Sequence, residues 1–129
     1  MIHIERIHHI AIICRDYQLS KDFYTKILGF KIEQEIYREE RNSYKLDLSL
    51  NGQYLIELFS FPDPPARMTR PEAAGLRHIA FAVKNIEKEV TSLADKHVFT
   101  EAIRIDECTG KKYTFFNDPD GLPIELYEL

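Results

Sequence analysis

A pair of residues, one histidine and one glutamate, occurs twice in this chain at nearly the same separation. Glu57 follows His9 by 48 positions, and Glu125 follows His78 by 47. The second pair is displaced from the first by 69 and 68 positions, about half of the 129-residue chain. Because unrelated polar residues would not repeat both spacings, the pattern predicts two structurally equivalent halves.

The residue types in this repeat indicate a metal site. Imidazole nitrogens and carboxylate oxygens suit zinc, nickel, cobalt, iron or manganese, whereas an all-oxygen set would favour magnesium or calcium. Buried carboxylates are costly unless a cation or hydrogen bonds compensate them, and one divalent ion would neutralise both glutamates. We therefore predict a single metal site with four ligands: His9, Glu57, His78 and Glu125.

Each ligand candidate interrupts an apolar strand face in the sequence pattern. Side chains alternate along a strand, so His9 shares a face with Ile13, and Glu57 shares one with Phe59. These faces are expected to belong to the core. His8 is expected to point away from His9. The two histidines without a repeat partner are expected to face solvent or to lie outside the ligand shell: His3 and His97.

The first half predicts a strand, a helix and three further strands. A β-branched run marks a strand at 7–14, and apolar residues at helical spacing mark a helix at 16–28. Asp16 or Ser20 can cap this helix, and Gly29 stands where a left-handed residue ends it. Strands are expected at 30–37, 44–50 and 53–61, with the Asn51-Gly52 turn between the last two.

The second half predicts the same order of elements. A strand is expected at 76–83, a helix after a cap at Asn85, and strands at 99–105, 112–116 and 122–127. Four prolines lie at 62–75, a composition that fits neither a helix interior nor a central strand. The expected fold class is α+β, with one βαβββ module at about 5–61, a linker at about 62–75 and a second module at about 76–129.

Composition and charge exclude several classes of partner. The 17 basic and 21 acidic residues give a net charge of −4 and are interspersed, which leaves no basic stripe for nucleic acid or an anionic membrane. No apolar run approaches the roughly 18 residues of a spanning helix, and the first residues lack a signal-peptide pattern. We expect a soluble, cytoplasmic protein in which Cys14 and Cys108 are reduced, core-like thiols.

These motifs resemble the vicinal oxygen chelate (VOC) superfamily. The superfamily includes glyoxalase I, fosfomycin-resistance thiol transferases, extradiol dioxygenases, methylmalonyl-CoA epimerase and metal-free bleomycin-binding proteins. The resemblance rests on FYTKILGF at 23–30, DPDG at 118–121 and IEL at 124–126, with further matches at 8–12, 55–58 and 76–81. The segment at 59–73 is most similar to small bacterial glyoxalase-like proteins of the YaeR type.

The resemblance implies a single VOC domain over 1–129, in which the modules form a glyoxalase/bleomycin-resistance/dioxygenase-type fold. It implies one divalent ion per site, with Zn²⁺ or Ni²⁺ preferred and Co²⁺, Mn²⁺ or Fe²⁺ as alternatives. In glyoxalase-like homodimers the ligands come from two chains, so His9 and Glu57 of one subunit are expected to face His78 and Glu125 of the other. Glu125, and secondarily Glu57, are the expected acid/base groups.

The expected activity is that of a glyoxalase-like lyase or isomerase acting on a small α-hydroxycarbonyl or hemithioacetal. A fosfomycin-resistance-like thiol transferase and a non-catalytic small-molecule binding protein are the alternatives. Glyoxalase I carries an arginine and an asparagine that bind glutathione, and Ile13 and Phe61 occupy those positions here. Five basic residues could instead bind an anionic substrate: Arg67, Arg70, Arg77, Lys111 and Lys112.

Overall fold

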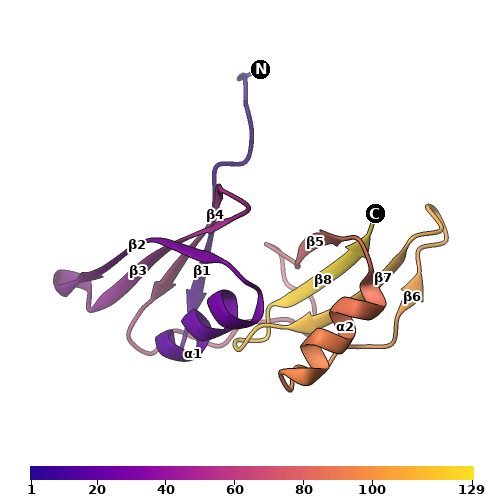
Figure 1. Cartoon of the computed structure of the whole chain (residues 1–129). Helices are drawn as coiled ribbons and strands as arrows, with labels where there is room; N and C mark the ends of the chain where they lie inside the picture. Colours follow the sequence, from indigo (N-terminus) through magenta and orange to yellow (C-terminus); the bar gives the residue numbers. More distant parts are fainter. The chain divides into compact units, whose positions relative to one another are not determined.

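Two four-stranded sheets, each accompanied by a helical segment, make up the α+β architecture (Figure 1). The computed structural model describes all residues, 1–129. The chain divides into two compact units, Met1–Pro65 and Ala66–Leu129, and the boundary lies within the proline-rich segment. No helix is long and apolar enough to cross a membrane.

The first unit contains a sheet with the strand order β1-β4-β3-β2. Strand β1 pairs in parallel with β4, whereas the β2–β3 and β3–β4 pairs are antiparallel. Asn51 and Gly52 both adopt positive φ, which fits the predicted two-residue hairpin between β3 and β4. In chain order, the elements are β1 (Ile10–Cys14), α1 (Tyr17–Asp22), a π-helix (Phe23–Ile27), β2 (Lys31–Arg38), a 3₁₀ turn (Glu39–Arg41), β3 (Ser43–Leu50) and β4 (Gln53–Ser60).

The helical segment of this unit differs in one respect from the prediction. Asp16 caps α1, as expected, by accepting a hydrogen bond from the Leu19 amide at 3.0 Å. The α-helix ends at Asp22 and continues as a π-helix that reaches Ile27. The wider π turn brings two adjacent aromatic side chains, Phe23 and Tyr24, to the buried side.

The second unit repeats this topology with the strand order β5-β8-β7-β6. Strand β5 pairs in parallel with β8, and the other pairs are antiparallel. Asn85 caps α2 by accepting a hydrogen bond from the Lys88 amide at 3.0 Å. The two predicted βαβββ modules are therefore confirmed. The elements are β5 (Ile79–Val83), α2 (Ile86–Asp95), β6 (Arg104–Ile105), β7 (Lys112–Asn117) and β8 (Pro123–Glu128).

Three strands are shorter than predicted because fewer of their residues pair with the neighbouring strand. Strand β1 begins at Ile10 and β5 at Ile79, where their pairing with β4 and β8 begins. His9 and His78 therefore stand immediately before the strands rather than inside them. The strand predicted at 99–105 is reduced to the two residues of β6 that pair with β7.

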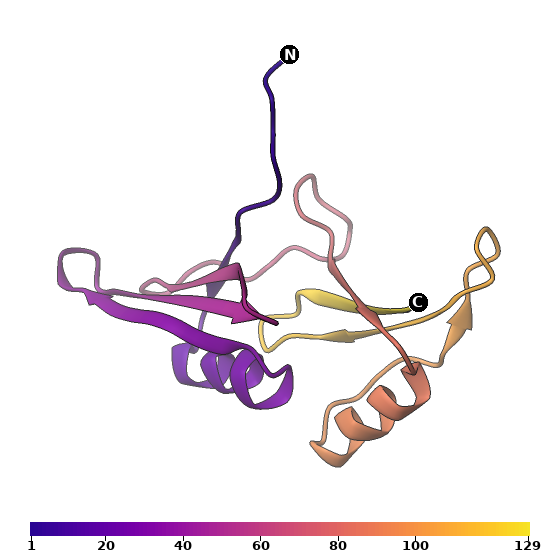
Figure 2. The same cartoon turned by 45° about the horizontal axis from the view of Figure 1, so that its top comes forward.

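The core of each unit lies between one face of its sheet and its helix (Figure 2). In β4, Ile56 and Leu58 are fully buried on this face, so Glu57 lies on the opposite face. The prediction that the histidine and glutamate interrupt the core face is therefore wrong, since Ile13 on the same face is 55% exposed. Cys14 belongs to the core, but Cys108 lies exposed in the turn between β6 and β7, contrary to the prediction of two core-like thiols.

Candidate metal centre

The first histidine–glutamate pair meets because β1 and β4 are parallel neighbours. Their register aligns Ala11 with Glu57, so His9, two residues earlier on the same side, lies beside the glutamate. The His9 Nε2 atom is 3.8 Å from Glu57 Oε1. The Glu57 side chain is 16% exposed and that of His9 36%, which leaves the pair accessible from the open face of the sheet.

The second pair forms in the same way in the second unit. Strands β5 and β8 align Ala80 with Glu125, which brings the preceding His78 beside the glutamate. The His78 Nε2 atom is 3.0 Å from Glu125 Oε2, and the side chains are 29% and 14% exposed. The spacing repeat in the sequence thus corresponds to the same register in the two sheets.

Both pairs have donor atoms that suit a divalent ion, and the donor separation of the second pair matches that of two ligands on one metal. Ligand atoms about 2.1 Å from one metal lie roughly 3.0–3.4 Å apart when they are adjacent in octahedral or tetrahedral geometry. The His78–Glu125 separation of 3.0 Å lies within this span, and the His9–Glu57 separation of 3.8 Å is slightly longer. No group of three or more His, Cys, Asp or Glu side chains is arranged to hold a metal ion, and each unit brings together one histidine and one glutamate of the repeat.

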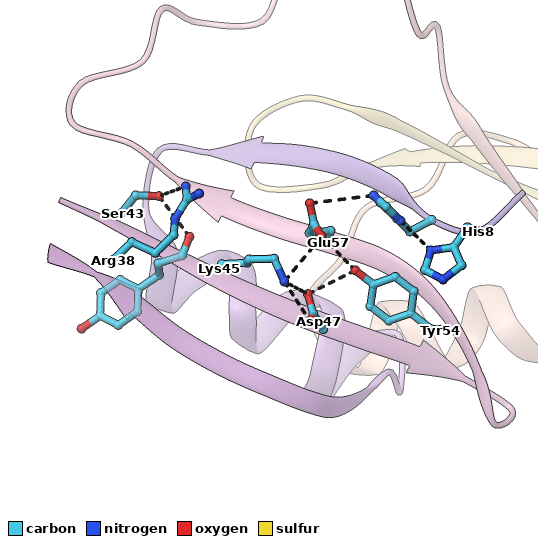
Figure 3. A network of polar contacts seen from close by, with 9 residues as sticks. His8, Arg38, Ser43, Lys45, Asp47, Tyr54 and Glu57 are labelled. Atoms are coloured by element: carbon cyan, nitrogen blue, oxygen red, sulfur yellow. Dashed lines mark hydrogen bonds and ion pairs between the residues drawn. The ribbon is translucent and has the colours of Figure 1, made fainter. Parts of the chain in front are cut away.

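Glu57 lies in a network of polar side chains on the open face of the first sheet (Figure 3). The Tyr54 hydroxyl is 3.0 Å from Glu57 Oε2 and 3.1 Å from Asp47 Oδ1. Lys45 Nζ donates to Asp47 Oδ1 at 2.8 Å and lies 3.5 Å from Glu57 Oε2. Because one cation and one hydroxyl serve both carboxylates, Glu57 is held in place by its neighbours.

The network keeps its donors protonated. Burial, and then the hydrogen bond to Glu57, raise the pKa of Tyr54 well above its usual value. The hydrogen bond to Asp47 raises the pKa of Lys45, although partial burial opposes this effect. Tyr54 therefore remains a neutral donor, and Lys45 remains a cation, at neutral pH.

His8 contacts His9, contrary to the prediction that it points away. The two Nδ1 atoms are 2.8 Å apart, and the rings meet edge to face with centroids 5.1 Å apart. The Tyr54 ring lies 5.5 Å from the His9 ring, centroid to centroid. Because His8 precedes the first paired residue of β1 by two positions, its side chain does not follow the alternation on which the prediction depended. A hydrogen bond at Nδ1 leaves Nε2 available for a metal, an arrangement common among histidine ligands.

The cross-strand neighbour of Glu125 is aromatic, whereas that of Glu57 is ionic. Glu125 is aligned across the sheet with Phe115, and the equivalent neighbour of Glu57 is Asp47. The Phe115 ring meets the His78 ring edge to face at a centroid distance of 5.2 Å. The Nδ1 atom of His78 is buried without a hydrogen-bond partner. The carboxylate of Glu125 is therefore held by fewer polar side chains of its own sheet than that of Glu57.

The basic residues proposed from the sequence have different roles in the structure. Arg70 and Arg77 line a cleft of about 290 Å³ that also contains His78. Arg67 instead donates to the carbonyl groups of Leu76 and Arg77, at 2.7 and 2.9 Å. Lys112 forms an ion pair with Glu87 of α2 at 2.5 Å, away from the cleft.

Four residues of the candidate site were missed by sequence reasoning: Lys45, Asp47, Tyr54 and Arg104. The alternation Leu46, Asp47, Leu48 is the signal that could have placed Asp47 on the same face as Glu57. Arg104, which lines the cleft beside His78, had no comparable signal because β6 is only two residues long.

Comparison with known proteins identifies the family to which this arrangement belongs. The profile of the Glyoxalase/Bleomycin resistance protein/Dioxygenase superfamily matches residues 6–126, nearly the whole chain. The chain belongs to this superfamily. Its members include glyoxalase I and fosfomycin-resistance enzymes, so membership alone leaves several activities open, and members of this glyoxalase family commonly bind a divalent metal.

Similar proteins from several bacteria cover the same length of chain. YwkD of Bacillus subtilis (strain 168), an uncharacterised protein, is 66% identical over 125 residues, which are 97% of this chain and 98% of YwkD. YaeR of Escherichia coli (strain K12), also uncharacterised, is 59% identical over 99% of each chain. The crystal structure of a glyoxalase family protein from Enterococcus faecalis has a TM-score of 0.90 at 50% identity, covering 96% of this chain and 98% of that one. These similarities confirm the glyoxalase-type fold.

Ile13 and Phe61, where the resemblance to glyoxalase I implies an arginine and an asparagine, have no polar group in their side chains. Ile13 is exposed, and Phe61 stacks on Phe59 at a centroid distance of 5.9 Å. Neither side chain can donate a hydrogen bond to a peptide carboxylate. Arg38 lies 5.8 Å from the Phe61 ring, but its guanidinium also donates to Ser43 at 3.0 Å.

Proposed function

We propose that this protein is a divalent-metal-dependent lyase or isomerase of the glyoxalase type. The proposal rests on one observation: two histidine–glutamate pairs occupy equivalent positions in two equivalent sheets, with donor separations of 3.8 and 3.0 Å. His9, Glu57, His78 and Glu125 are the proposed ligands. Two carboxylates match the charge of a divalent ion, and the two imidazole nitrogens favour Zn²⁺ or Ni²⁺, with Co²⁺, Mn²⁺ or Fe²⁺ as alternatives.

We infer that the complete protein is a homodimer in which each site takes one pair from each subunit. Each pair supplies only two donors, fewer than the three or more protein ligands typical of catalytic zinc sites. A twofold dimer joins the first pair of one subunit to the second pair of the other, and does so twice. In this arrangement residues 1–129 act as one functional domain.

The two glutamates have different proposed roles. Glu57 is hydrogen-bonded by Tyr54 and lies near Lys45, so it acts mainly as a fixed ligand. Glu125 faces Phe115, whose ring offers no hydrogen bond, and is therefore freer to take a proton from a substrate carbon and return it to the adjacent carbon. When bound, a divalent ion would supply the positive charge that polarises two vicinal substrate oxygens.

The proposed substrate is a small α-hydroxycarbonyl compound or a hemithioacetal of a thiol other than glutathione. Ile13 and Phe61 cannot provide the charge-assisted hydrogen bonds that a glutathione carboxylate needs. The residues beside the second pair combine aromatic rings with cations, which suits a substrate with a short carbon chain and polar oxygens.

The test compares turnover and folding in the Glu125→Gln variant. Metal-loaded wild type should convert members of a panel of hydroxycarbonyls and hemithioacetals, and Glu125→Gln should lose at least about a hundredfold in kcat, as expected for a lost acid/base group. The free energy of unfolding of the metal-free variant should change by less than about 1 kcal/mol, since the side chains are nearly isosteric. Unchanged turnover in the variant would remove Glu125 from the mechanism.

The same assay distinguishes the other activities of the superfamily. Consumption of a thiol in the presence of an epoxide, without isomerisation of hydroxycarbonyls, would support a thiol transferase instead. Tight binding of small molecules by a protein that takes up no metal and converts none of the panel would support a binding protein. Either result would contradict the proposed lyase or isomerase activity.

A further inference from the structure

The cleft beside His78 contains an unusual concentration of charged side chains. Its volume is about 290 Å³, close to the lower end of the range for small-molecule sites. Its lining includes three arginines, which are Arg70, Arg77 and Arg104, and two glutamates, which are Glu72 and Glu101. His78 and Phe115 also line it. Among these side chains the arginines exceed the glutamates by one charge, so the cleft favours an anion.

The two glutamates form only weak, exposed ion pairs with two of the arginines. Arg104 pairs with Glu101 at 2.9 Å, and both side chains are 52% exposed. Arg77 pairs with Glu72 at 3.4 Å, with side chains 64% and 59% exposed. Exposed pairs of this kind contribute on the order of 0–1 kcal/mol, so an incoming anion can replace the glutamates at little cost.

One arginine of the cleft and the backbone segment before His78 are held in position by other contacts. The Arg104 guanidinium lies over the Tyr113 ring, 5.0 Å from its centroid, which keeps it at the cleft when its ion pair opens. Arg67 donates to the backbone carbonyls of Leu76 and Arg77 and so fixes the segment that leads into His78. Arg104 and the backbone before His78 are therefore in place before a ligand arrives, which reduces the entropy lost on binding.

We propose that this cleft binds the oxyanion group of the substrate, a carboxylate or a phosphate, beside His78. Guanidinium groups form paired, charge-assisted hydrogen bonds with either group. Assigning the bound anion as a substrate rests on the proposed function, because His78 is one of the proposed metal ligands. The substrate class becomes a small hydroxycarbonyl compound that carries one acidic group.

The experiment is a calorimetric titration with inorganic phosphate, malonate and, as the uncharged control, glycerol. Each titration is made on chelator-treated protein and on protein loaded with Ni²⁺, in a low-chloride buffer. Phosphate or malonate should bind in both states, and the tighter of the two identifies the preferred acidic group. Arg70→Gln combined with Arg104→Gln should weaken binding at least about tenfold. Lys112→Gln, which removes one positive charge at the Glu87 pair outside the cleft, should bind as the wild type does.

A second variant distinguishes loss of the anion site from damage to the fold by the arginine substitutions. Glu101→Gln removes the carboxylate that competes for Arg104 and should tighten phosphate or malonate binding severalfold, which a disturbed fold would not do. Unchanged binding in the double arginine variant, or an equal loss in Lys112→Gln, would overturn the proposal. Binding that requires Ni²⁺ would also overturn it, because the anion would then be held by the metal.

The outcomes separate this inference from the proposed function. Nickel uptake without anion binding would leave the metal proposal standing and contradict the arginine cleft. Anion binding through the arginines by a protein that takes up no metal would support the cleft and contradict the proposed metal-dependent activity.

Discussion

At the scale of single residues, the two glutamates of the repeat differ in what surrounds them. Glu57 shares Tyr54 and Lys45 with Asp47, whereas Glu125 faces the ring of Phe115. Two equivalent backbone positions therefore provide two chemical environments. This difference is the basis for proposing that Glu57 is a fixed ligand and Glu125 a proton carrier.

The Tyr54→Phe variant tests whether the hydroxyl group positions Glu57. Removing it leaves the carboxylate with one donor fewer, which should weaken metal binding several-fold and lower the free energy of unfolding by about 1 kcal/mol. Metal titration and urea denaturation measure the two effects. Tyr37→Phe is the control, because the Tyr37 hydroxyl bonds to Asn42 at the other hairpin of the same sheet. Equal metal affinity in the two variants would contradict the positioning role.

At the scale of elements, hydrophobic alternation and turn chemistry predicted most strands and both helix caps, whereas register did not follow from the sequence. A regular hairpin around Asn51-Gly52 would align Asp47 with Ile56. The structure aligns Leu50 with Gln53 but Asp47 with Glu57, because an irregularity near Leu48 and Ser49 inserts one residue. The network around Glu57 depends on this shift. A single inserted residue has no local sequence signature strong enough to place it in advance.

A cluster between α1 and β2 makes the stability of the first unit depend on pH. Glu35 accepts hydrogen bonds from Lys21, at 2.6 Å, and from Tyr17. These bonds, that of Lys21 first, lower the pKa of Glu35 in the folded protein. The contribution of Glu35 to the free energy of unfolding is therefore complete above the pKa of a glutamate in the unfolded chain, about 4.3. It is lost as the pH falls through the lower pKa of Glu35 in the folded protein.

The Glu35→Gln variant measures this contribution. At pH 7 it should lower the free energy of unfolding by about 0.5 kcal/mol, a small value because the Glu35 side chain is one-third exposed. Below the folded pKa the wild type and the variant should be nearly equal, as judged by urea denaturation at both pH values. Glu40→Gln, a substitution at an exposed position in the 3₁₀ turn, is the control. A difference that persists unchanged at low pH would contradict the assignment.

The turn before β8 should be a second determinant of stability. The buried Asp118 accepts hydrogen bonds through Oδ1 from the amides of Asp120 and Leu122, each at 2.9 Å. Asp118→Ala leaves both amides without this partner and should cost about 2 kcal/mol or more. Asp118→Asn keeps an oxygen acceptor and should cost less than half as much. Thermal or urea denaturation compares the two, and equal losses would show that charge rather than hydrogen bonding matters here.

At the scale of the whole molecule, the repeat and the family predicted a two-module fold with one pair of ligands in each module. The structure bears out the modules and brings each histidine to its glutamate. The residues that surround each pair depend on neighbours far apart in sequence, which is why the arginine cleft and the tyrosine network could not be fully predicted. The union of the two pairs on one metal remains the central proposal.

Metal content after subunit mixing tests that proposal most directly. Elemental mass spectrometry should find about one divalent ion per subunit in the wild type and in His3→Ala, and almost none in His9→Ala or His78→Ala. When these two inactive variants are refolded together in equal amounts, half of the dimers are hybrids with one intact site, so about a quarter of the wild-type metal should return. Metal retained by either single variant would contradict the ligand set, and no recovery on mixing would contradict a site built from two subunits.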